Sequence, residues 1–331
     1  MRRAHPRLAR AASPVALASV LLVGVPRLAL AHVGGVVGPD DLWSQWGGNA
    51  GEILLLLVPA LWYAAGVRAL WRQAGRGHGI AAWRVAAFGA GLLVLAGALL
   101  SPLDALADAL FSAHMVQHLL LILVAAPLLV AGAPVLAFLW SLPIGARRAV
   151  GRWWTARLLV RQAVHAVTSP GSAFALHLVA LWFWHLPVPY QAALASPGMH
   201  ALEHLSFLGT AGLFWWAVAP PMGRRRASEG AALLLIAGTL MQSGALGAVL
   251  MLARAPWYPA HAAGARAWST TLLDDQQLAG LVMWVPASFV YMAAAAWVFL
   301  GWMRRDEREG MRATGAGRRL AHALPGLEGV R

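Results

Sequence analysis

The stretch LFSAHMVQHLLLILVAAPLLVA, residues 110–131, decides the fold. It is long and apolar enough to cross roughly 30 Å of hydrocarbon as one helix of about 20 residues. It nevertheless carries two histidines near its start, His114 and His118, four positions apart. The stretch therefore predicts a membrane helix that carries ionisable side chains in its first turns. The positions of the polar residues elsewhere in the chain should explain why these side chains are there.

The composition of the whole chain also indicates a membrane protein. Of its 331 residues, 60% are hydrophobic and 12% are charged, which is far more apolar than a soluble domain. The formal net charge is +13, but the arginines lie between apolar stretches rather than on one face of a soluble domain. We therefore expect the lipid bilayer as a partner, and no nucleic acid.

Six further stretches are also long and apolar enough to be predicted as membrane spans, although the fourth span, 172–187, looks short. The predicted spans are 50–72, 82–101, 110–131, 172–187, 199–219, 229–253 and 276–303. Pro127 and Pro134 should kink or break the third span near its far end, and Pro187 and Pro189 should end the fourth. The expected fold class is all-α, a polytopic integral membrane helix bundle with seven transmembrane helices over residues 50–303.

The two ends of the chain differ from this core. Residues 1–31 have a basic start, an apolar middle and the tripeptide ALA at 29–31, which is typical of a signal segment. Residues 304–331 are rich in Arg and Gly, and we predict a disordered cytoplasmic tail.

Arginine fixes the predicted orientation. The connections after the first, third and fifth spans and the C-terminal tail are rich in arginine, whereas the opposite side carries only Arg254 and Arg266. Cytoplasmic loops are the positive ones, so the N-terminus should lie outside and the C-terminus in the cytoplasm.

This topology brings histidines from three spans to the outer side. His114 and His118, His200 and His204 form two pairs, each four residues apart and therefore on one helix face. His185 falls at the same depth at the end of the fourth span, beside Asp275 at the start of the seventh and Met115 on the third. We predict one metal site with His114, His118, His200 and His204 as ligands, followed by His185, Asp275 and Met115.

The other histidines receive different predictions. His177 lies two turns below His185 and can serve as a polar strut between helices. His78, His165, His261 and His322 fall in loops or tails, where we expect them to be solvated.

The chain has no cysteine, so a metal must be held by imidazole, thioether, carboxylate or amide groups. Imidazole suits copper and zinc, and an added thioether favours Cu(I), so copper is the expected metal and zinc the alternative. The sequence His200-Ala-Leu-Glu203-His204 also fits H-x-x-E-H, in which Glu is the general base of a zinc hydrolase. Copper transport through His177 and Gln242, and haem binding, stay open as further alternatives.

A series of motifs resembles a known family. HMVQHLLL with PLLVAGAP, then WFWHLPVPYQAAL, HALEHLSFLGTAGLFWW and DDQQLAGLVMWVP are similar, in order and type, to the CtaG-like family of multi-span cytochrome c oxidase assembly factors. The resemblance runs from about residue 50 to 303. Small departures are Asp274 beside Asp275, and Ala279 and Ala287 where glycine was expected.

The resemblance implies a non-enzymatic role in caa-type oxidase assembly in the bacterial plasma membrane. It implies cytochrome c oxidase subunits as partners, with copper chaperones as further ones. The family's polar motifs map onto His114 and His118, onto the His200-x-x-Glu203-His204 segment, and onto Asp275 with Gln276.

Overall fold

The computed structural model describes residues 37–48, 50–220 and 227–323. The predicted signal segment and the last eight residues lie outside this part. All regular secondary structure in the described residues is helical. In chain order the elements are η1 (Leu42–Ser44), α2 (Ala50–Ala74), α3 (Ala82–Leu99), α4 (Pro102–Ala109), α5 (Phe111–Leu119), η2 (Leu120–Ala125), α6 (Ala126–Ala131), α7 (Pro134–Ser141), α8 (Ile144–Ala156), α9 (Leu158–Val167), α10 (Pro170–Trp184), α11 (Pro187–Ala195), α12 (Pro197–Val218), α13 (Glu229–Met251), η3 (Pro259–His261), α14 (Ala262–Ala267) and α15 (Leu272–Ala323).

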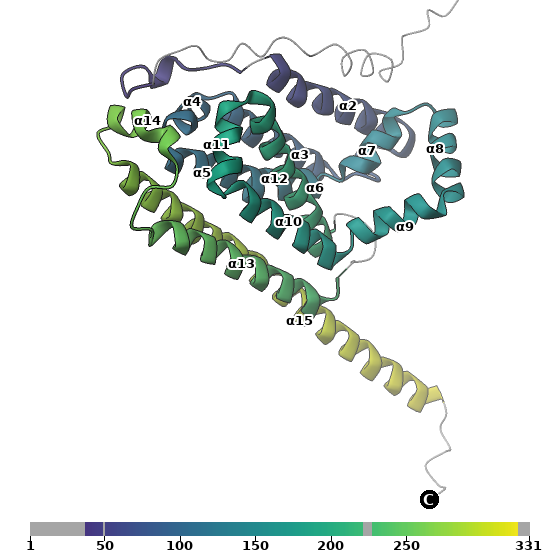
Figure 1. Ribbon diagram of the computed structural model, residues 1–331. Helices are drawn as coiled ribbons and strands as arrows, with labels where there is room; N and C mark the ends of the chain where they lie inside the picture. The colour runs from purple at the N-terminus through teal and green to yellow at the C-terminus, as the bar shows by residue number, and fades with distance from the viewer. Residues whose placement is uncertain (1–36, 49, 221–226, 324–331) are drawn as a thin grey trace, which may run out of the picture.

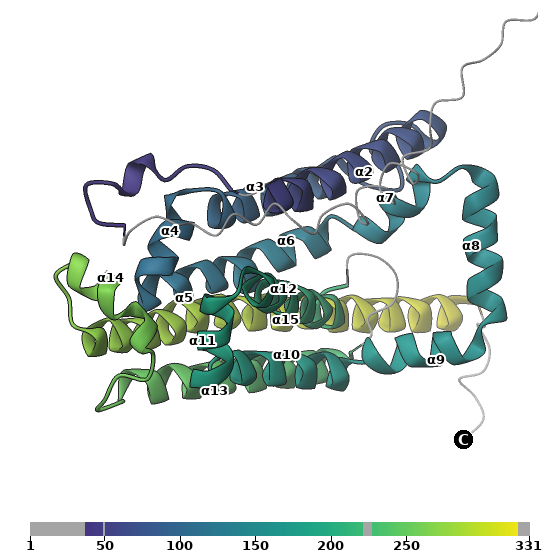
Figure 2. The same cartoon turned by 45° about the horizontal axis from the view of Figure 1, so that its top comes forward.

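The helices form an elongated bundle whose long members run roughly along one direction (Figures 1 and 2). α4, α11 and α14 lie at one end of it, together with the start of α15. At the other end α8 runs across that direction, and α15 continues alone past the bundle. The acidic first turns of α4 and α15 and the arginine-rich α8 therefore occupy opposite ends.

Five helical segments of the described chain are long and apolar enough to cross a membrane: Ala50–Ala74, Ala82–Leu99, Phe111–Ala131, Glu229–Met251 and Leu272–Glu307. A sixth is obtained if α9 and α10, which meet at a 60° bend, count as one. The prediction of an all-helical membrane bundle is confirmed, whereas the count of seven is not. The predicted span that is missing from this set is 199–219, which corresponds to α12. This helix is long enough, but His200, Glu203 and His204 in its first turns lower its mean hydropathy.

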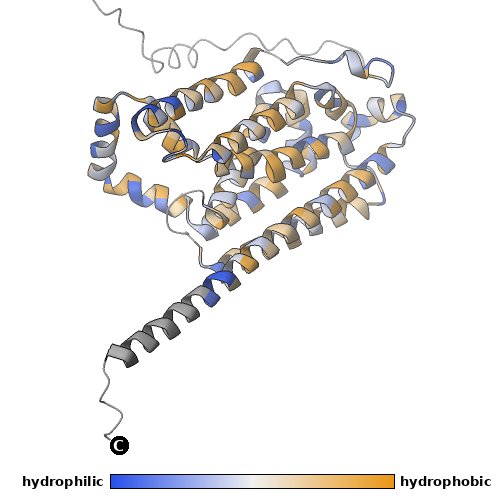
Figure 3. Ribbon diagram, turned by 180° about the vertical axis from the view of Figure 1, so that it is seen from behind, coloured by the Kyte–Doolittle hydropathy of each residue, from blue (hydrophilic) through white to orange (hydrophobic). Residues whose placement is uncertain are grey.

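Large apolar side chains cover the outer surface of the bundle. Leu93, Leu234, Met241 and Phe289 are each at least 64% exposed, and hydrophobic residues dominate the long helices in Figure 3. In water such a surface would cost about 25 cal/mol for each Å² of apolar area, whereas hydrocarbon accommodates it. The exposed surface is thus consistent with lipid around the bundle.

The stretch 110–131 is the central span and is far more buried than the other four. It is not a regular helix, because α5 and α6 are joined by the π-helical turn η2. Pro127 has no N–H for the carbonyl four residues back, and its ring crowds that carbonyl, which favours such a widened turn. The indole N–H of Trp215 donates to the carbonyl of Ile122, 2.9 Å away, and so satisfies a backbone group within η2.

The predicted break near Pro134 is also present. Ala133 has a left-handed backbone, with φ of 52°, and separates α6 from α7. The Tyr63 hydroxyl donates to the carbonyl of Gly132 at 2.8 Å and ties this break to α2. A stacked pair of Tyr63 and Phe88, with ring centroids 3.8 Å apart, packs α2 against α3 beside it.

α13 and α15 form the closest long pair (Figure 1). A Cβ atom at Gly280 would stand 2.5 Å from the carbonyl oxygen of Gly247, so the two backbones touch where both residues lack a side chain. Residues 304–323, for which the sequence predicts disorder, continue α15 as helix. Good helix formers such as Ala, Arg, Glu, Met and Leu fill much of this segment, and it contains no proline.

Candidate metal centre

The candidate site is built by the first turns of α5 and α12. α5 begins at Phe111 and places His114 and His118 one turn apart, with ring centroids separated by 4.3 Å. α12 begins at Pro197 and places His200 and His204 in the same way, at 4.2 Å. Each pair shares a helix face, as its spacing predicted.

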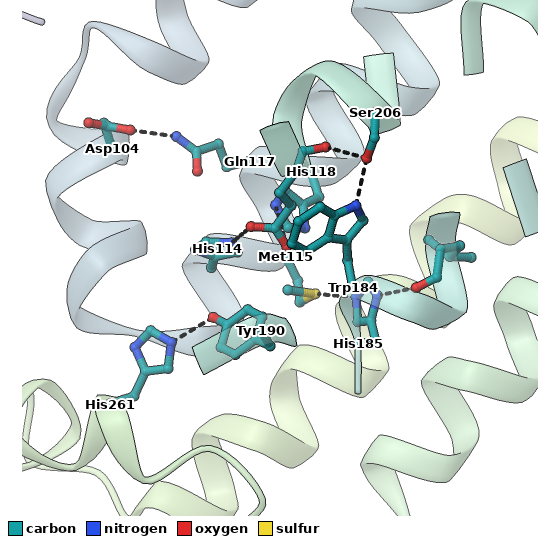
Figure 4. A network of polar contacts seen from close by, with 12 residues as sticks. Asp104, His114, Met115, Gln117, His118, Trp184, His185, Tyr190, Ser206 and His261 are labelled. Carbon is teal, nitrogen blue, oxygen red and sulfur yellow. Dashed lines mark hydrogen bonds and ion pairs between the residues drawn. The ribbon is translucent and has the colours of Figure 1, made fainter. Parts of the chain in front are cut away.

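The two pairs face each other across the helix interface. The rings of His114 and His200 are stacked with centroids 5.3 Å apart, and those of His118 and His204 meet edge to face at the same distance. We call His114, His118, His200 and His204, together with Glu203, the histidine cluster. The sequence predicted the four imidazoles, and the structure brings all four together (Figure 4 labels His114 and His118).

Glu203 is fully buried within the histidine cluster. Its two carboxylate oxygens lie 3.8 Å from Nε2 of His114 and 3.8 Å from Nε2 of His118. These distances are too long for hydrogen bonds, and both oxygens are buried without a hydrogen-bond partner among the described residues. The sequence indicated Glu203 as the general base of a zinc hydrolase, and the structure places its carboxylate between the imidazoles of His114 and His118.

Ligand atoms converge in two overlapping sets. His114, His118 and His204 each offer one atom within 4.8 Å of the others, and so do His114, His200 and Glu203. Two imidazole nitrogens bound to one ion at about 2.0–2.1 Å are at most about 4.2 Å apart, so modest side-chain movement would close either set around an ion.

The ring nitrogens of the histidine cluster also lack other partners. Nε2 of all four histidines, and Nδ1 of His118, are buried without a hydrogen bond to any described residue. Buried polar atoms are normally satisfied, and leaving one unpaired costs about 1–3 kcal/mol. A bound cation would satisfy several of these atoms at once.

Asp275 is not part of the converging sets. α5 has no side-chain cap of its own, and Asp275 on α15 supplies one: its carboxylate accepts from the backbone N–H of Phe111 at 2.7 Å and of Ser112 at 3.1 Å. The Ser112 hydroxyl donates to it as well. Asp275, predicted as a ligand, thus has its oxygens occupied at the start of α5, where it positions His114 and His118 indirectly.

His185 and Met115 contact each other below the histidine cluster. Nε2 of His185 lies 3.2 Å from the sulfur of Met115, and both side chains are buried (Figure 4). The ring centroid of His185 is 6.2 Å from that of His118. These two predicted ligands therefore adjoin the cluster but lie outside both converging sets.

His261 was predicted to be solvated, and that prediction is wrong. It is 1% exposed, and its Nε2 lies 2.6 Å from the hydroxyl oxygen of Tyr190 (Figure 4). Burial lowers the pKa of His261 to about 4, so the ring is neutral at neutral pH. Aromatic neighbours in its loop, Trp257 and Tyr258, were the available sequence signal that the loop folds inward.

Two further contacts support the site. The amide nitrogen of Gln117 donates to the Asp104 carboxylate at 2.7 Å and to the carbonyl of Ala98 at 2.8 Å, which links α5 to α4 and α3 (Figure 4). His177 lies 3.2 Å from the Thr210 hydroxyl, so it does join α10 to α12 as a strut.

Comparison with known proteins identifies the family. The model of the cytochrome c oxidase caa3 assembly factor family matches residues 61–305. Uncharacterized proteins of Mycobacterium bovis and Mycobacterium tuberculosis are each 28% identical over 267 residues. The match covers 79% of this chain but 39% of each relative, so the chain spans well under half of their length.

No solved structure matches the chain. The family match extends over all the helices that build the histidine cluster, from within α2 to within α15. The chain belongs to the cytochrome c oxidase caa3 assembly factor family.

Proposed function

We propose that this assembly factor binds copper at the histidine cluster and supplies it to a caa3-type oxidase. The observation that carries the proposal is the convergence of two buried imidazoles, two partly buried ones and one buried carboxylate whose ligand atoms lack other partners among the described residues. An oxidase subunit is then the recipient, a copper chaperone is a candidate donor, and the protein itself catalyses no reaction.

The donor set suits copper. Imidazole is a good ligand for copper and zinc, and the chain offers no thiolate that would hold either ion more tightly. Glu203 brings one negative charge into a site otherwise made of neutral ligands, and this lowers the cost of burying a cation. When bound, copper would be held by His114 and by members of either converging set.

The distribution of charge supports an orientation in the bacterial plasma membrane. Arginines on α8 and at the far end of α15 lie at the end of the bundle opposite the histidine cluster (Figure 2). Under the positive-inside rule that end is cytoplasmic, so the cluster faces the outer compartment.

Metal analysis of the purified protein tests the binding step. After loading with Cu(I), the wild type should retain copper, and the His114→Ala/His118→Ala variant should lose most of it. His78→Ala/His165→Ala, which removes an exposed loop histidine and an exposed histidine of α9, is the matched control and should bind as the wild type does. Equal copper in the wild type and the His114/His118 variant would refute the proposed site.

A gene deletion tests the assembly step. Cells lacking this chain should contain caa3-type oxidase with reduced copper and reduced activity, and the wild-type gene should restore both. Normal copper content in the oxidase of the deletion strain would rule out delivery by this protein.

A zinc hydrolase is the second candidate, because Glu203 lies within 3.8 Å of two histidines. A hydrolase needs its general base, so Glu203→Gln should abolish its activity while zinc stays bound. For a copper-delivery protein the same variant should still support oxidase assembly, with weaker metal binding. Full complementation by Glu203→Gln would therefore eliminate the hydrolase.

A further inference from the structure

We propose a second metal site, specific for Cu(I), formed by Met115, His185 and Met283 and adjoining the histidine cluster at His118. The choice of copper rests on the proposed function. The site itself rests on separate residues, and its test lets the two proposals fail independently.

The hydrogen bonding of His185 is the first argument. Its Nδ1 lies 2.7 Å from the carbonyl oxygen of Leu181, which can only accept, so Nδ1 carries the proton. In a neutral ring Nε2 is then unprotonated and presents a lone pair. That lone pair meets the Met115 sulfur at 3.2 Å, which is itself an acceptor. Two lone pairs thus face each other, and a cation between them would satisfy both.

The spacing of these two atoms is the second argument. With metal–sulfur and metal–nitrogen distances of about 2.3 and 2.0 Å, donors at a tetrahedral angle lie roughly 3.5 Å apart. The observed 3.2 Å is shorter by only a few tenths of an ångström. A small rotation of the flexible Met115 side chain would therefore admit an ion.

A cavity beside this contact provides the remaining space. It has a volume of about 20 Å³, which is room for roughly one water molecule or one ion. Its lining includes Met115, His118, His177, His185 and Met283. Met283 comes from α15 and is 5% exposed, so a second thioether borders the same space from a different helix.

The residues that line the cavity favour a soft ion with a single positive charge. Thioether and imidazole are uncharged ligands that suit Cu(I), and no carboxylate lines the cavity. Burying an ion without a counter-charge costs free energy in a medium of low dielectric constant. This cost rises steeply with the charge of the ion. Cu(I) is therefore favoured over Zn(II) here, whereas the histidine cluster contains Glu203.

His118 contributes to both the histidine cluster and the cavity of the second site. It is a member of the His114–His118–His204 set, and it also lines the cavity. A Cu(I) ion can pass between the sites by exchanging ligands around His118, with no change in oxidation state. The two sites thus form a short path from the end of the bundle into its interior.

X-ray absorption spectroscopy on the purified protein, loaded anaerobically with Cu(I), tests the second site by identifying the atoms around copper. Competition against a Cu(I) chelator measures how many Cu(I) ions bind and how tightly. The wild type should show sulfur as well as nitrogen neighbours of copper. Met115→Leu/Met283→Leu keeps the side-chain volume and should lose the sulfur signal and weaken one Cu(I) equivalent at least tenfold. Zn(II) binding at the histidine cluster should be unchanged. Met241→Leu, on an exposed face of α13, is the matched control.

The two proposals separate in this experiment. His200→Ala/His204→Ala should reduce Zn(II) binding and keep the sulfur signal, so a failure of the histidine cluster leaves the second site measurable. Copper with nitrogen and oxygen neighbours only, in the wild type, would overturn the second site even if the cluster binds metal. A sulfur signal unaltered in Met115→Leu/Met283→Leu would overturn it as well.

Discussion

Tyr190 and His261, 71 residues apart in sequence, share a buried hydrogen bond of 2.6 Å. Burial raises the pKa of the Tyr190 phenol well above its ordinary value, so the hydroxyl stays protonated. The bond joins α11 to η3, and the rings of both residues lie against His114, with centroids 5.2 and 6.4 Å away. Together they close one side of the histidine cluster.

Tyr190→Phe should therefore destabilise the protein without removing its metal. The substitution leaves Nε2 of His261 buried and unpaired, at a cost of about 1–3 kcal/mol. We expect a lower melting temperature in detergent by size-exclusion analysis, and wild-type copper content. His78→Ala, in an exposed loop, should leave the melting temperature unchanged, and loss of copper in Tyr190→Phe would mean that this pair does more than brace the cluster.

Asp275→Ala should lower stability more strongly, because Asp275 caps α5. Loss of a helix cap costs about 0.5–2 kcal/mol, and the buried Ser112 hydroxyl also loses its acceptor. Asp275→Asn keeps one acceptor oxygen and should be milder, with copper retained in both folded variants. Asp274→Ala, at the adjacent exposed position, provides the comparison, and a selective loss of copper in Asp275→Asn at normal stability would make Asp275 a ligand after all.

The buried carboxyl group of Asp104 should make the free energy of unfolding depend on pH. Burial raises its pKa to about 7, against the hydrogen bond from Gln117. The folded protein therefore holds a proton that the unfolded chain releases near pH 4, so this group makes stability fall as the pH rises from about 4 to about 7. The Asn side chain of Asp104→Asn stays neutral at every pH in this range. The melting temperature of the variant minus that of the wild type should therefore increase as the pH rises from about 4 to about 7.

The control for that series is Asp40→Asn, which changes an exposed carboxylate. It should follow the wild-type pH dependence. Parallel curves for Asp104→Asn and wild type between pH 4 and 8 would contradict the proposed role of burial at Asp104.

Gly280→Ala tests the contact between α13 and α15. The new Cβ atom would stand 2.5 Å from the carbonyl oxygen of Gly247, so the helices must move apart. Overpacking of this kind costs about 1–3 kcal/mol, and we expect a melting temperature lower by several degrees. Gly209→Ala, on α12 with open space around it, should be neutral or slightly stabilising; equal behaviour of the two variants would argue against a tight crossing.

Local spacing in the sequence predicted much of the site. Apolar length fixed the central span, and the four-residue spacing of His114 with His118 and of His200 with His204 put each pair on one face. Pro127 and Pro134 correctly marked the irregular part of the third span. These features depend on helix geometry within about two turns, which residue order determines by itself.

Tertiary structure alone decided how the helices present those faces to one another. It turned Glu203 inward between two histidine pairs, assigned Asp275 to the start of α5, buried His261 against Tyr190, and brought the Met115 sulfur to His185. Each of these contacts joins segments far apart in the chain, and each depends on the rotation and depth of one helix relative to another. That relation is set by packing over the whole bundle, such as the Gly247–Gly280 crossing, and no local pattern in the sequence encodes it.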